Sequence, residues 1–322
     1  MSRDHVKSKV AAQTWQVYGL SFSSQHVFQT PLHPSPSAPD LVFNFQKRPA
    51  WSDTKWEGAE AVASSPTAGD VQVVVRRSGD EFCLKLGDWA SYVIQPGKIS
   101  GYVQTSDFLI IAELRFLDTA LPLYLELLNT PVLHASAVEL EGKVIAFTAY
   151  AGGGKSSLAA GMTKRGARFM ADDVVALTRL ASVYWVSPGY PQLRLWPDAA
   201  AELIGPEGHQ LIHPSWQKRR ATVEGWGGFS AKPGPLGLIY LVDCREEHRR
   251  VNISVPRGHN KLMKMLYNSP AIPALSILTQ LDRMKFFSDL ISNVPVRVLS
   301  YPRRYEMIPE VLDTLTEDAL VG

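Results

Sequence analysis

The sequence has little cysteine and almost no excess charge. Among 322 residues there are two cysteines, Cys83 and Cys244, too few for a disulfide framework or for a zinc cluster of cysteines alone. The 33 lysine and arginine residues nearly balance the 31 aspartate and glutamate residues, so no bulk field favours nucleic acid or an anionic membrane as a partner. We therefore expect partners to be selected by specific sites.

Long hydrophobic runs are also absent. No segment approaches the roughly 18 to 20 apolar residues that a transmembrane helix requires. The first fifteen residues are charged and lack the hydrophobic core of a secretory signal, which predicts a cytoplasmic protein. Hydrophobic residues make up 45% of the chain, which favours folded cores over disorder, and the length suggests about two domains.

Residues 1–130 have the pattern of a mainly antiparallel β domain. Short alternating apolar segments separated by turn residues predict strands at 15–22, 41–45, 71–76, 82–86 and 108–112. The proline-rich segment 30–40 predicts an exposed loop, and segment 51–70 predicts another. Leucines at helical spacing from 115 to 129 predict a connector helix that Pro122 begins or kinks.

From residue 131 to residue 322 the pattern changes to alternating strands and helices, which predicts an α/β domain. Strands are expected at 132–140, 144–148, 168–171, 238–242, 251–255 and 296–300. Helices are expected at 156–165, where Gly166 is a good C-cap, at 257–268, at 281–292 and from about 305 onward.

The most specific motif is a phosphate-binding loop at residues 149–156. It reads Ala-Tyr-Ala-Gly-Gly-Gly-Lys-Ser and fits G-x-x-x-x-G-K-[ST] except that Ala149 replaces the first glycine. If that position required a positive φ, the loop would have to be reshaped. A strand leads in and a helix leads out, so backbone N–H groups can surround a phosphate at the positive end of the helix dipole. The residues expected to bind nucleotide are Gly152, Gly153, Gly154, Lys155, Ser156 and Ser157. A glycine-rich turn before a surface helix is the alternative.

Two adjacent carboxylates, Asp172 and Asp173, follow Lys155 by seventeen residues at the end of a predicted strand. Neighbouring strand ends would place them beside the phosphates. There one aspartate can hold Mg²⁺ together with the Ser156 hydroxyl, and the other can accept the proton of an attacking hydroxyl. Adjacent carboxylates should also raise one pKa unless Mg²⁺ offsets their repulsion. A solvated acidic turn is the alternative.

Four features allow a functional and a plain structural interpretation. His134 lies in a predicted strand, where it can be structural or catalytic. Residues 224–235 combine glycines with two aromatics and predict either a mobile lid or a plain surface loop. The basic residues 218–220 can bind phosphate or an acidic peptide, or form a solvated patch. Arg257 opens a predicted helix and can contact transferred phosphate or take part in capping.

The order of these motifs resembles the catalytic domain of HPr kinase/phosphorylase. That family has a histidine in a strand, a P-loop, a helix ending Lys-Arg-Gly and a strand ending Ala-Asp-Asp. The matching residues here are His134, 152–156, 164–166 and 171–173. Residues 255–260 are similar to the family's arginine-bearing loop. Leu193-Arg194 is the nearest counterpart of its Leu-Glu-x-Arg-Gly segment and lacks the glutamate.

The resemblance implies an α/β fold in which a P-loop catalytic domain of the HPr-kinase type follows the mainly antiparallel β domain. ATP and Mg²⁺ are the implied cofactors. Asp172 is implied as the base facing the acceptor hydroxyl, and Asp173 and Ser156 as the metal ligands. His134 and Arg257 are implied as further catalytic residues near the phosphates.

Three further segments resemble the HPr-kinase-like kinases of lasso-peptide pathways, and they lie at 18–22, 133–139 and 188–198. This resemblance implies a serine acceptor, typically at the C-terminus of a precursor peptide. We expect a peptide or small-protein partner, which could add to a sheet edge of the N-terminal domain, and a homo-oligomer is compatible with the sequence. The alternatives are a bifunctional HPr kinase/phosphorylase acting on a carrier protein and a non-catalytic nucleotide-gated module. A GTPase is disfavoured because residues 259–263 lack the aspartate of Asn-Lys-x-Asp.

Overall fold

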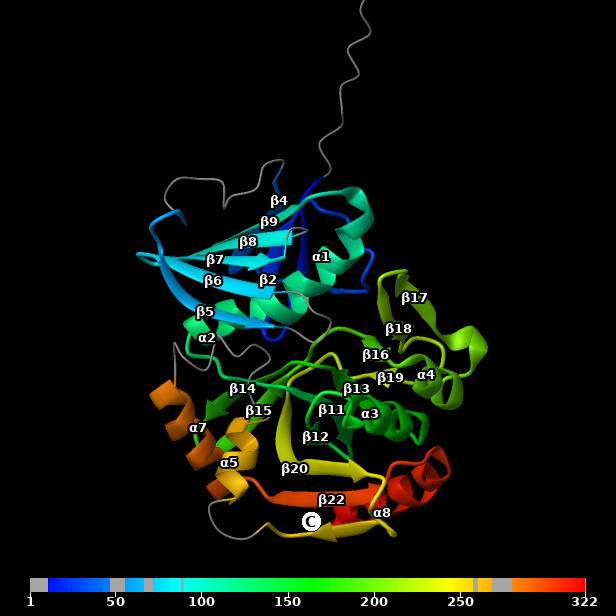
Figure 1. The fold of residues 1–322 in the computed structure, drawn as a ribbon. Helices are drawn as coiled ribbons and strands as arrows, with labels where there is room; N and C mark the ends of the chain where they lie inside the picture. Colours follow the sequence, from blue (N-terminus) through cyan, green and yellow to red (C-terminus); the bar gives the residue numbers. More distant parts are fainter. Residues whose placement is uncertain are drawn as a thin grey trace, which may run out of the picture.

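The computed structural model describes residues 11–46, 56–66, 72–87, 90–256, 260–267 and 280–321. It has a mixed α/β architecture with a nine-stranded, a ten-stranded and a three-stranded sheet. In Figure 1 the nine-stranded sheet lies above the ten-stranded sheet, and the three-stranded sheet lies to one side. Across these ranges no helix has the length and hydrophobicity needed to span a membrane.

The nine-stranded sheet has the order β3-β1-β2-β4-β9-β8-β7-β6-β5. Its strands are β1 (Gln13–Val17), β2 (Leu20–Ser24), β3 (His33–Pro34), β4 (Leu41–Phe45), β5 (Glu60–Pro66), β6 (Gln72–Ser78), β7 (Glu81–Leu86), β8 (Ala90–Gln95) and β9 (Lys98–Val103). Pairing is antiparallel except at β2–β4 and β4–β9. The segment predicted as one strand at 15–22 is a hairpin, and β5 lies within the predicted loop 51–70.

The prediction of a strand at 108–112 was wrong. After a short turn, η3 (Ser106–Phe108), helix α1 (Leu109–Arg115) begins there and continues through a π-helical turn, η4 (Phe116–Ala120), into α2 (Leu121–Leu127). A short continuous apolar run has no period that separates a helix from a strand. The helix packs on the sheet, where the ring of Phe116 stacks on Phe43 with centroids 3.7 Å apart.

Three acidic side chains on this largely apolar helix are buried, namely Glu113, Asp118 and Glu126. Glu113 accepts hydrogen bonds from the loop after β2. Asp118 pairs with Arg194, and Glu126 pairs with Arg283. Buried carboxylates are costly unless they are paired, so each of these contacts ties the helix to a distant part of the chain.

The ten-stranded sheet follows the path β10-β14-β15-β20-β12-β11-β13-β19, with β22 beside β20 and β21 beside β22. Its strands are β10 (Val132–Leu133), β11 (Ala135–Leu140), β12 (Lys143–Thr148), β13 (Arg168–Ala171), β14 (Val175–Leu180), β15 (Val183–Ser187), β19 (Gly228–Phe229), β20 (Gly234–Arg245), β21 (Asn252–Ser254) and β22 (Val296–Pro302). The central strands β12, β20 and β22 are parallel.

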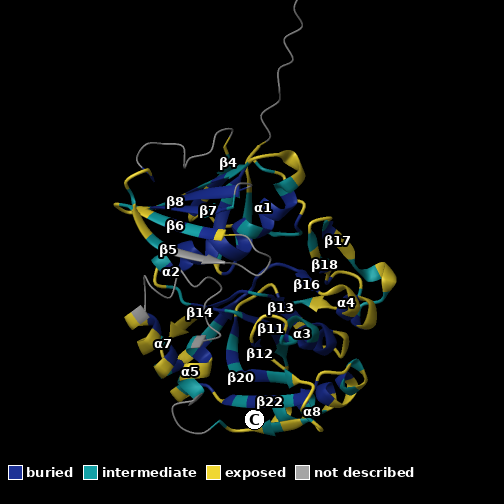
Figure 2. Ribbon diagram, in the orientation of Figure 1, coloured by how far each residue is buried: buried dark blue, intermediate teal, exposed yellow. Residues whose placement is uncertain are grey.

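Helices and short turns surround this sheet: α3 (Lys155–Lys164), α4 (Pro197–Leu203), η5 (Pro206–Gly208), α5 (Asn260–Tyr267), α7 (Gln280–Asn293), η6 (Tyr305–Met307) and α8 (Ile308–Val321). Along β12, Ile145 and Phe147 pack with side chains of α3 and α8, whereas Val144 and Ala146 pack with those of α5 and α7. This alternation follows from the two-residue period of a strand. The sheet is therefore covered on both faces, and its central strands are buried in Figure 2.

The three-stranded sheet has the order β16-β18-β17, with β16 (Gln192–Leu195), β17 (Gln210–His213) and β18 (Trp216–Thr222). Its pairs are antiparallel. Leu193, Leu195 and Ala221 are buried, and the two leucines pack in the cluster that contains Leu158 of α3. No strand was expected in this part of the chain.

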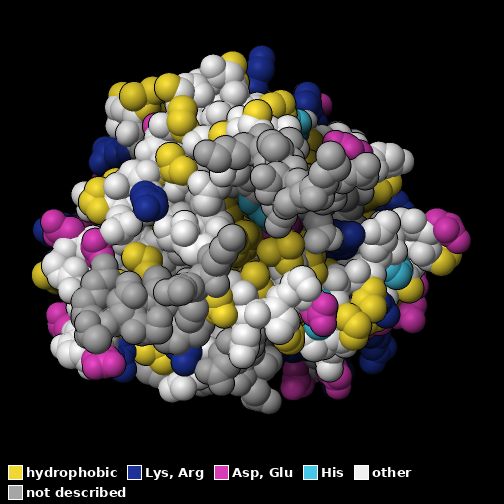
Figure 3. Space-filling view, turned by 90° about the horizontal axis from the view of Figure 1, so that it is seen from above, with side chains coloured by type: hydrophobic (Ala, Val, Ile, Leu, Met, Phe, Trp, Pro, Cys, Tyr) yellow, Lys and Arg dark blue, Asp and Glu magenta, His cyan; other side chains and the backbone are white. Residues whose placement is uncertain are grey.

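Viewed from the side of the nine-stranded sheet, charged side chains of both signs spread around the rim of the molecule (Figure 3).

Candidate functional site

The glycine-rich loop connects β12 to α3. Gly152 and Gly154 have φ values of 75° and 92°, which only glycine adopts readily. Ala149 is buried and does not belong to the described residues with positive φ. A Cβ on Gly153 would lie 2.7 Å from the Ala149 Cβ. Alanine is therefore tolerated at position 149 because the facing position 153 has no side chain.

Lys155 is the first residue of α3, and its side chain crosses the loop. Its Nζ donates to the carbonyl oxygens of Ala149 at 3.1 Å and Tyr150 at 3.3 Å. Burial lowers the pKa of Lys155, and the charges of Asp173 and Asp172 oppose that shift. The ammonium group thus contacts the loop carbonyls and is stabilised by the charges of the two carboxylates.

Asp172 lies just beyond β13 and has a contact at each carboxylate oxygen. Oδ1 accepts hydrogen bonds from Ser156 Oγ at 2.7 Å and from Ser136 Oγ at 2.6 Å. Oδ2 accepts the backbone N–H of Arg194 at 3.0 Å. Since β13 pairs with β11, the hydroxyls of β11 and α3 reach the same carboxylate.

Asp173 has a left-handed φ of 64°, which aspartate tolerates better than most residues. Its Oδ2 accepts a hydrogen bond from the Arg194 guanidinium at 2.5 Å. Burial alone would raise the pKa of Asp173. The positive charges of Lys218 and Arg194 outweigh this effect and hold the pKa well below its ordinary value, and other basic side chains contribute less. Asp173 is therefore an ionised carboxylate within a positive environment.

Arg194 connects Asp173, at the end of β13, with the helix that follows β9. Its guanidinium donates to Asp173 and, at 2.6 Å, to Asp118 of η4, and it lies over the ring of Trp216 at 5.5 Å. Burial alone would lower the pKa of Arg194, but Tyr190 and the two aspartates raise it well above its ordinary value. The fork geometry of a guanidinium suits two carboxylates at once.

His134 lies between β10 and β11, where the chain leaves one partner strand for another. Its Nδ1–H donates to the backbone oxygen of Asp173 at 2.9 Å. Burial, together with the charges of Lys155 and Lys218, lowers the pKa of His134 below its ordinary value of 6.5. At neutral pH the ring is neutral, so Nε2 is available as an acceptor.

We expect the lowered pKa of His134 to destabilise the protein in mild acid. The unfolded chain binds the proton below about pH 6.5 and the folded chain does not, so the free energy of unfolding should fall with pH there. The loss is about 1.4 kcal/mol for each unit of pKa difference. Asp173 acts in the same direction only as the pH approaches 3.8 and below.

The measurement is urea unfolding from about pH 5 to about pH 8, with His134→Asn as the comparison. The asparagine amide keeps a donor for the Asp173 carbonyl but does not titrate. Its free energy of unfolding should fall less steeply with acid than that of the unmodified chain. Equal slopes would contradict a buried neutral histidine at this position.

The structure brings most of the residues singled out in the sequence to one place. His134, Lys155, Ser156, Asp172 and Asp173 lie together at the ends of β12 and β13, and Ser157 follows in the first turn of α3. Of the basic residues 218–220, Lys218 is close enough to influence the pKa of Asp173. Arg257 lies outside the described residues.

Three residues of this network were not expected. Asp118 and Ser136 had no predicted role, and Arg194 was considered only as a counterpart of a family segment. Asp118 had one signal, which it shares with Glu113 and Glu126: an acidic residue on a largely apolar helix. Ser136 follows His134 by two positions, which a strand pattern would place on one face.

Residues 224–235 are not a single loop. Gly228 and Phe229 form β19, which pairs with β13, and the ring of His33 stacks on Phe229 with centroids 4.8 Å apart. The N–H of Ser230 donates to the backbone oxygen of Phe169 at 2.8 Å. These backbone and ring contacts make residues 228–230 part of the sheet, and a lid formed by residues 224–227 stays a prediction.

The donor set at Ser156 and Asp172 fits Mg²⁺. This ion prefers oxygen ligands, and in ATP sites it takes few of them from the protein and the rest from phosphates and water. A hydroxyl and a carboxylate oxygen 2.7 Å apart are ligands of that kind. The neighbouring loop amides and Lys155 are suited to the phosphates of a nucleotide.

No family model matches this chain, and neither does any curated protein. Among solved structures, the Hpr(Ser) kinase/phosphatase from Coxiella burnetii is similar, with a TM-score of 0.32 and 14% sequence identity. That similarity covers 59% of this chain and 99% of the other.

Proposed function

We propose that the protein is an ATP- and Mg²⁺-dependent kinase that phosphorylates a serine hydroxyl of a peptide, such as the C-terminal serine of a lasso precursor peptide. This proposal rests on two neighbouring hydrogen bonds at the glycine-rich loop. Lys155 Nζ donates to the carbonyl of Ala149, and the Ser156 hydroxyl donates to Asp172. Phosphoryl transfer depends mainly on positioning and on charge stabilisation. The loop, a metal and the lysine can supply both.

In this proposal the amides of residues 152–156 and the ammonium of Lys155 hold the phosphates, and α3 directs its positive end at them. Arg303 is an additional positive group here, because its guanidinium donates to the Gly152 carbonyl at 3.4 Å. Mg²⁺, when bound, would neutralise charge on the transferred phosphoryl group.

The hydrogen bonds favour a division of roles between the aspartates that differs from the one implied by family resemblance. Ser156 donates to Asp172, so we assign Asp172 to the metal side. Asp173, which Lys218 and Arg194 keep ionised, then orients the acceptor hydroxyl and receives its proton. The neutral His134 lies beside it as a further hydrogen-bond acceptor.

The test compares the unmodified protein with Lys155→Ala. Removing a charge-assisted contact costs roughly 1.5 to 3 kcal/mol, so ATP affinity or turnover should fall at least about tenfold. Titration with a fluorescent ATP analogue and a turnover assay measure the two quantities. Unchanged values in both would contradict nucleotide binding at the loop.

The acceptor is tested by incubation with Mg·ATP and, separately, a precursor peptide ending in serine, its Ser→Ala counterpart and HPr. A mass gain of one phosphoryl group on the serine peptide alone is the expected result. Labelling of HPr alone would instead indicate the bifunctional HPr enzyme. ATP binding without any labelling would indicate a nucleotide-gated module.

A further inference from the structure

One face of the three-stranded sheet is polar and leads away from the two aspartates. The polar face consists of Gln192, Arg194, Lys218, Arg220 and Thr222. Gln192 lies opposite Thr222, and Arg194 lies opposite Arg220. Directly paired residues share a face, and alternate residues along a strand do as well. The polar face therefore runs without a break from Arg194, beside the two aspartates, to Gln192 and Thr222.

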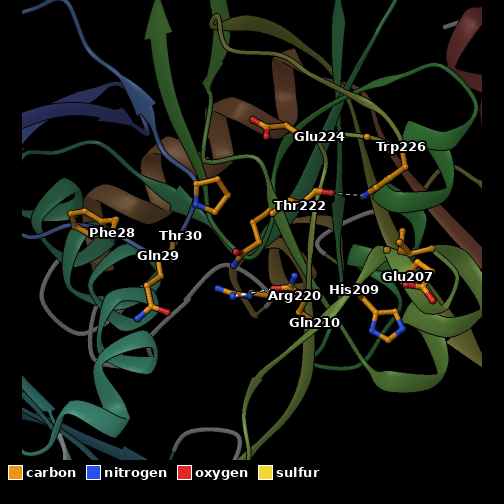
Figure 4. Close-up of a pocket in the computed structure, with 15 residues that line it drawn as sticks. Phe28, Gln29, Thr30, Glu207, His209, Gln210, Arg220, Thr222, Glu224 and Trp226 are labelled. Atoms are coloured by element: carbon orange, nitrogen blue, oxygen red, sulfur yellow. Dashed lines mark hydrogen bonds between the residues drawn. The ribbon is translucent and has the colours of Figure 1, made fainter.

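At its far end the polar face forms one wall of a cavity of 610 Å³, to which Gln192, Arg220 and Thr222 all contribute. The opposite wall is the loop from Phe28 to Pro31, after β2. In Figure 4, Phe28 and Gln29 lie on one side and Glu207 and His209 on the other, with Arg220 between them. The volume is that of known ligand sites, roughly 300 to 1,000 Å³.

The cavity walls are held in place. Both carboxylate oxygens of the buried Glu113 accept backbone N–H groups of the 28–31 loop, with the shortest contact 2.9 Å from Gln29 N. On the other side, Trp226 Nε1 donates to the Thr222 carbonyl at 2.5 Å. The cavity is therefore a preformed space between two anchored segments rather than a gap at a loose surface.

Gln192 is the unusual residue of this cavity. It is 2% exposed, and throughout the part of the chain that the structure describes neither Nε2 nor Oε1 has a hydrogen-bond partner. Buried side-chain amides are nearly always paired, and leaving both ends unpaired is costly. Such a group needs an explanation, and because Gln192 is a lining residue of the cavity, a ligand held there is a candidate partner for the amide.

We propose that this cavity binds an extended segment of the acceptor peptide and that the Gln192 amide pairs with one of its peptide groups. The inference rests on the proposed kinase function. A peptide group offers one C=O and one N–H, which match the NH₂ and the oxygen of the glutamine amide. The cavity also mixes Arg220 and His209 with Glu207 and Glu224, so its side chains do not favour a strongly charged segment of either sign.

The strand spacing predicts which peptide group is bound. Gln192 precedes Arg194 by two residues, about 6.6 Å along a strand, and the guanidinium of Arg194 contacts Asp173, which faces the acceptor hydroxyl in the proposed function. An extended peptide advances by the same distance per residue. The serine should therefore lie about two residues from the peptide group that Gln192 holds.

The experiment uses two pools of random N-acetylated octapeptides, one ending in serine and one ending in alanine. Gln192→Leu removes the amide but keeps an apolar side chain of similar size. It should raise the KM for the serine pool at least tenfold, leave the affinity for the fluorescent ATP analogue unchanged, and leave the melting temperature unchanged or higher. Gln217→Leu, an exposed glutamine on β18 outside the polar face, is the matched control and should change none of these values.

A second measurement does not depend on catalysis. The alanine pool should bind the unmodified protein and should bind Gln192→Leu at least tenfold more weakly. If the leucine variant does not fold, Gln192→Ala replaces it.

In the serine pool, replacing the peptide group two residues before the serine by an ester should also raise KM. Binding of the alanine pool without phosphorylation of the serine pool would support the peptide site and contradict the kinase. Phosphorylation with equal KM in Gln192→Leu, or no binding of either pool, would overturn the inference.

Discussion

Asp172→Asn is expected to reduce phosphoryl transfer by about 10² to 10³, the range for loss of one group that stabilises charge in the transition state. The carboxylate is buried and accepts hydrogen bonds from Ser156, Ser136 and the Arg194 N–H. An amide has one acceptor oxygen and no charge, so it cannot replace these contacts or hold a metal equally well. Phosphoryl transfer to the serine peptide, measured by mass, checks the result.

The Mg²⁺ dependence of this variant separates the two assignments of the aspartates. If Asp172 is on the metal side, Asp172→Asn should raise the Mg²⁺ concentration needed for half-maximal transfer. Asp173→Asn should then lower transfer at an unchanged Mg²⁺ requirement. The reverse outcome would restore the roles that the family resemblance implied, and wild-type transfer by Asp172→Asn would contradict both.

Arg283→Met is expected to lower the free energy of unfolding by about 3 to 5 kcal/mol, as when one partner of a buried ion pair is removed. The side chains of Arg283 in α7 and Glu126 in α2 are 3% and 2% exposed. Glu126 also accepts the Val132 N–H at 2.8 Å, and the Arg283 guanidinium donates to the Val132 carbonyl at 3.3 Å. Without the arginine, the buried carboxylate loses this ion pair.

Chemical denaturation measures the loss, and two controls show its cause. Lys285→Met on the same helix removes an exposed partner of Asp282, 3.8 Å away, and should change stability little. The double variant Glu126→Gln/Arg283→Met also removes the charge of the carboxylate and should recover part of the stability. A double variant no more stable than Arg283→Met would show that the charge of Glu126 is not the cause.

The sequence alone predicted the local parts of the candidate site. The glycine-rich loop, Lys155, Ser156 and the two aspartates lie within a short stretch of chain, where a strand, a loop and a helix follow each other in a pattern that local rules predict. Most strands of the ten-stranded sheet with runs of buried residues were also predictable, including β12 and β13. The division of the chain into domains at residue 130 stays a prediction.

Only the tertiary structure decided the surroundings of these groups. Arg194 reaches Asp118 across 76 residues of sequence, and Ser136 reaches Asp172 across 36. Such pairs depend on how sheets and helices pack, and no periodicity records them. The same holds for Gln192, whose strand was not expected at all. Its side-chain amide is buried and has no hydrogen-bond partner among the described residues. Burial and hydrogen-bond partners are properties of the folded chain, so the sequence does not record them.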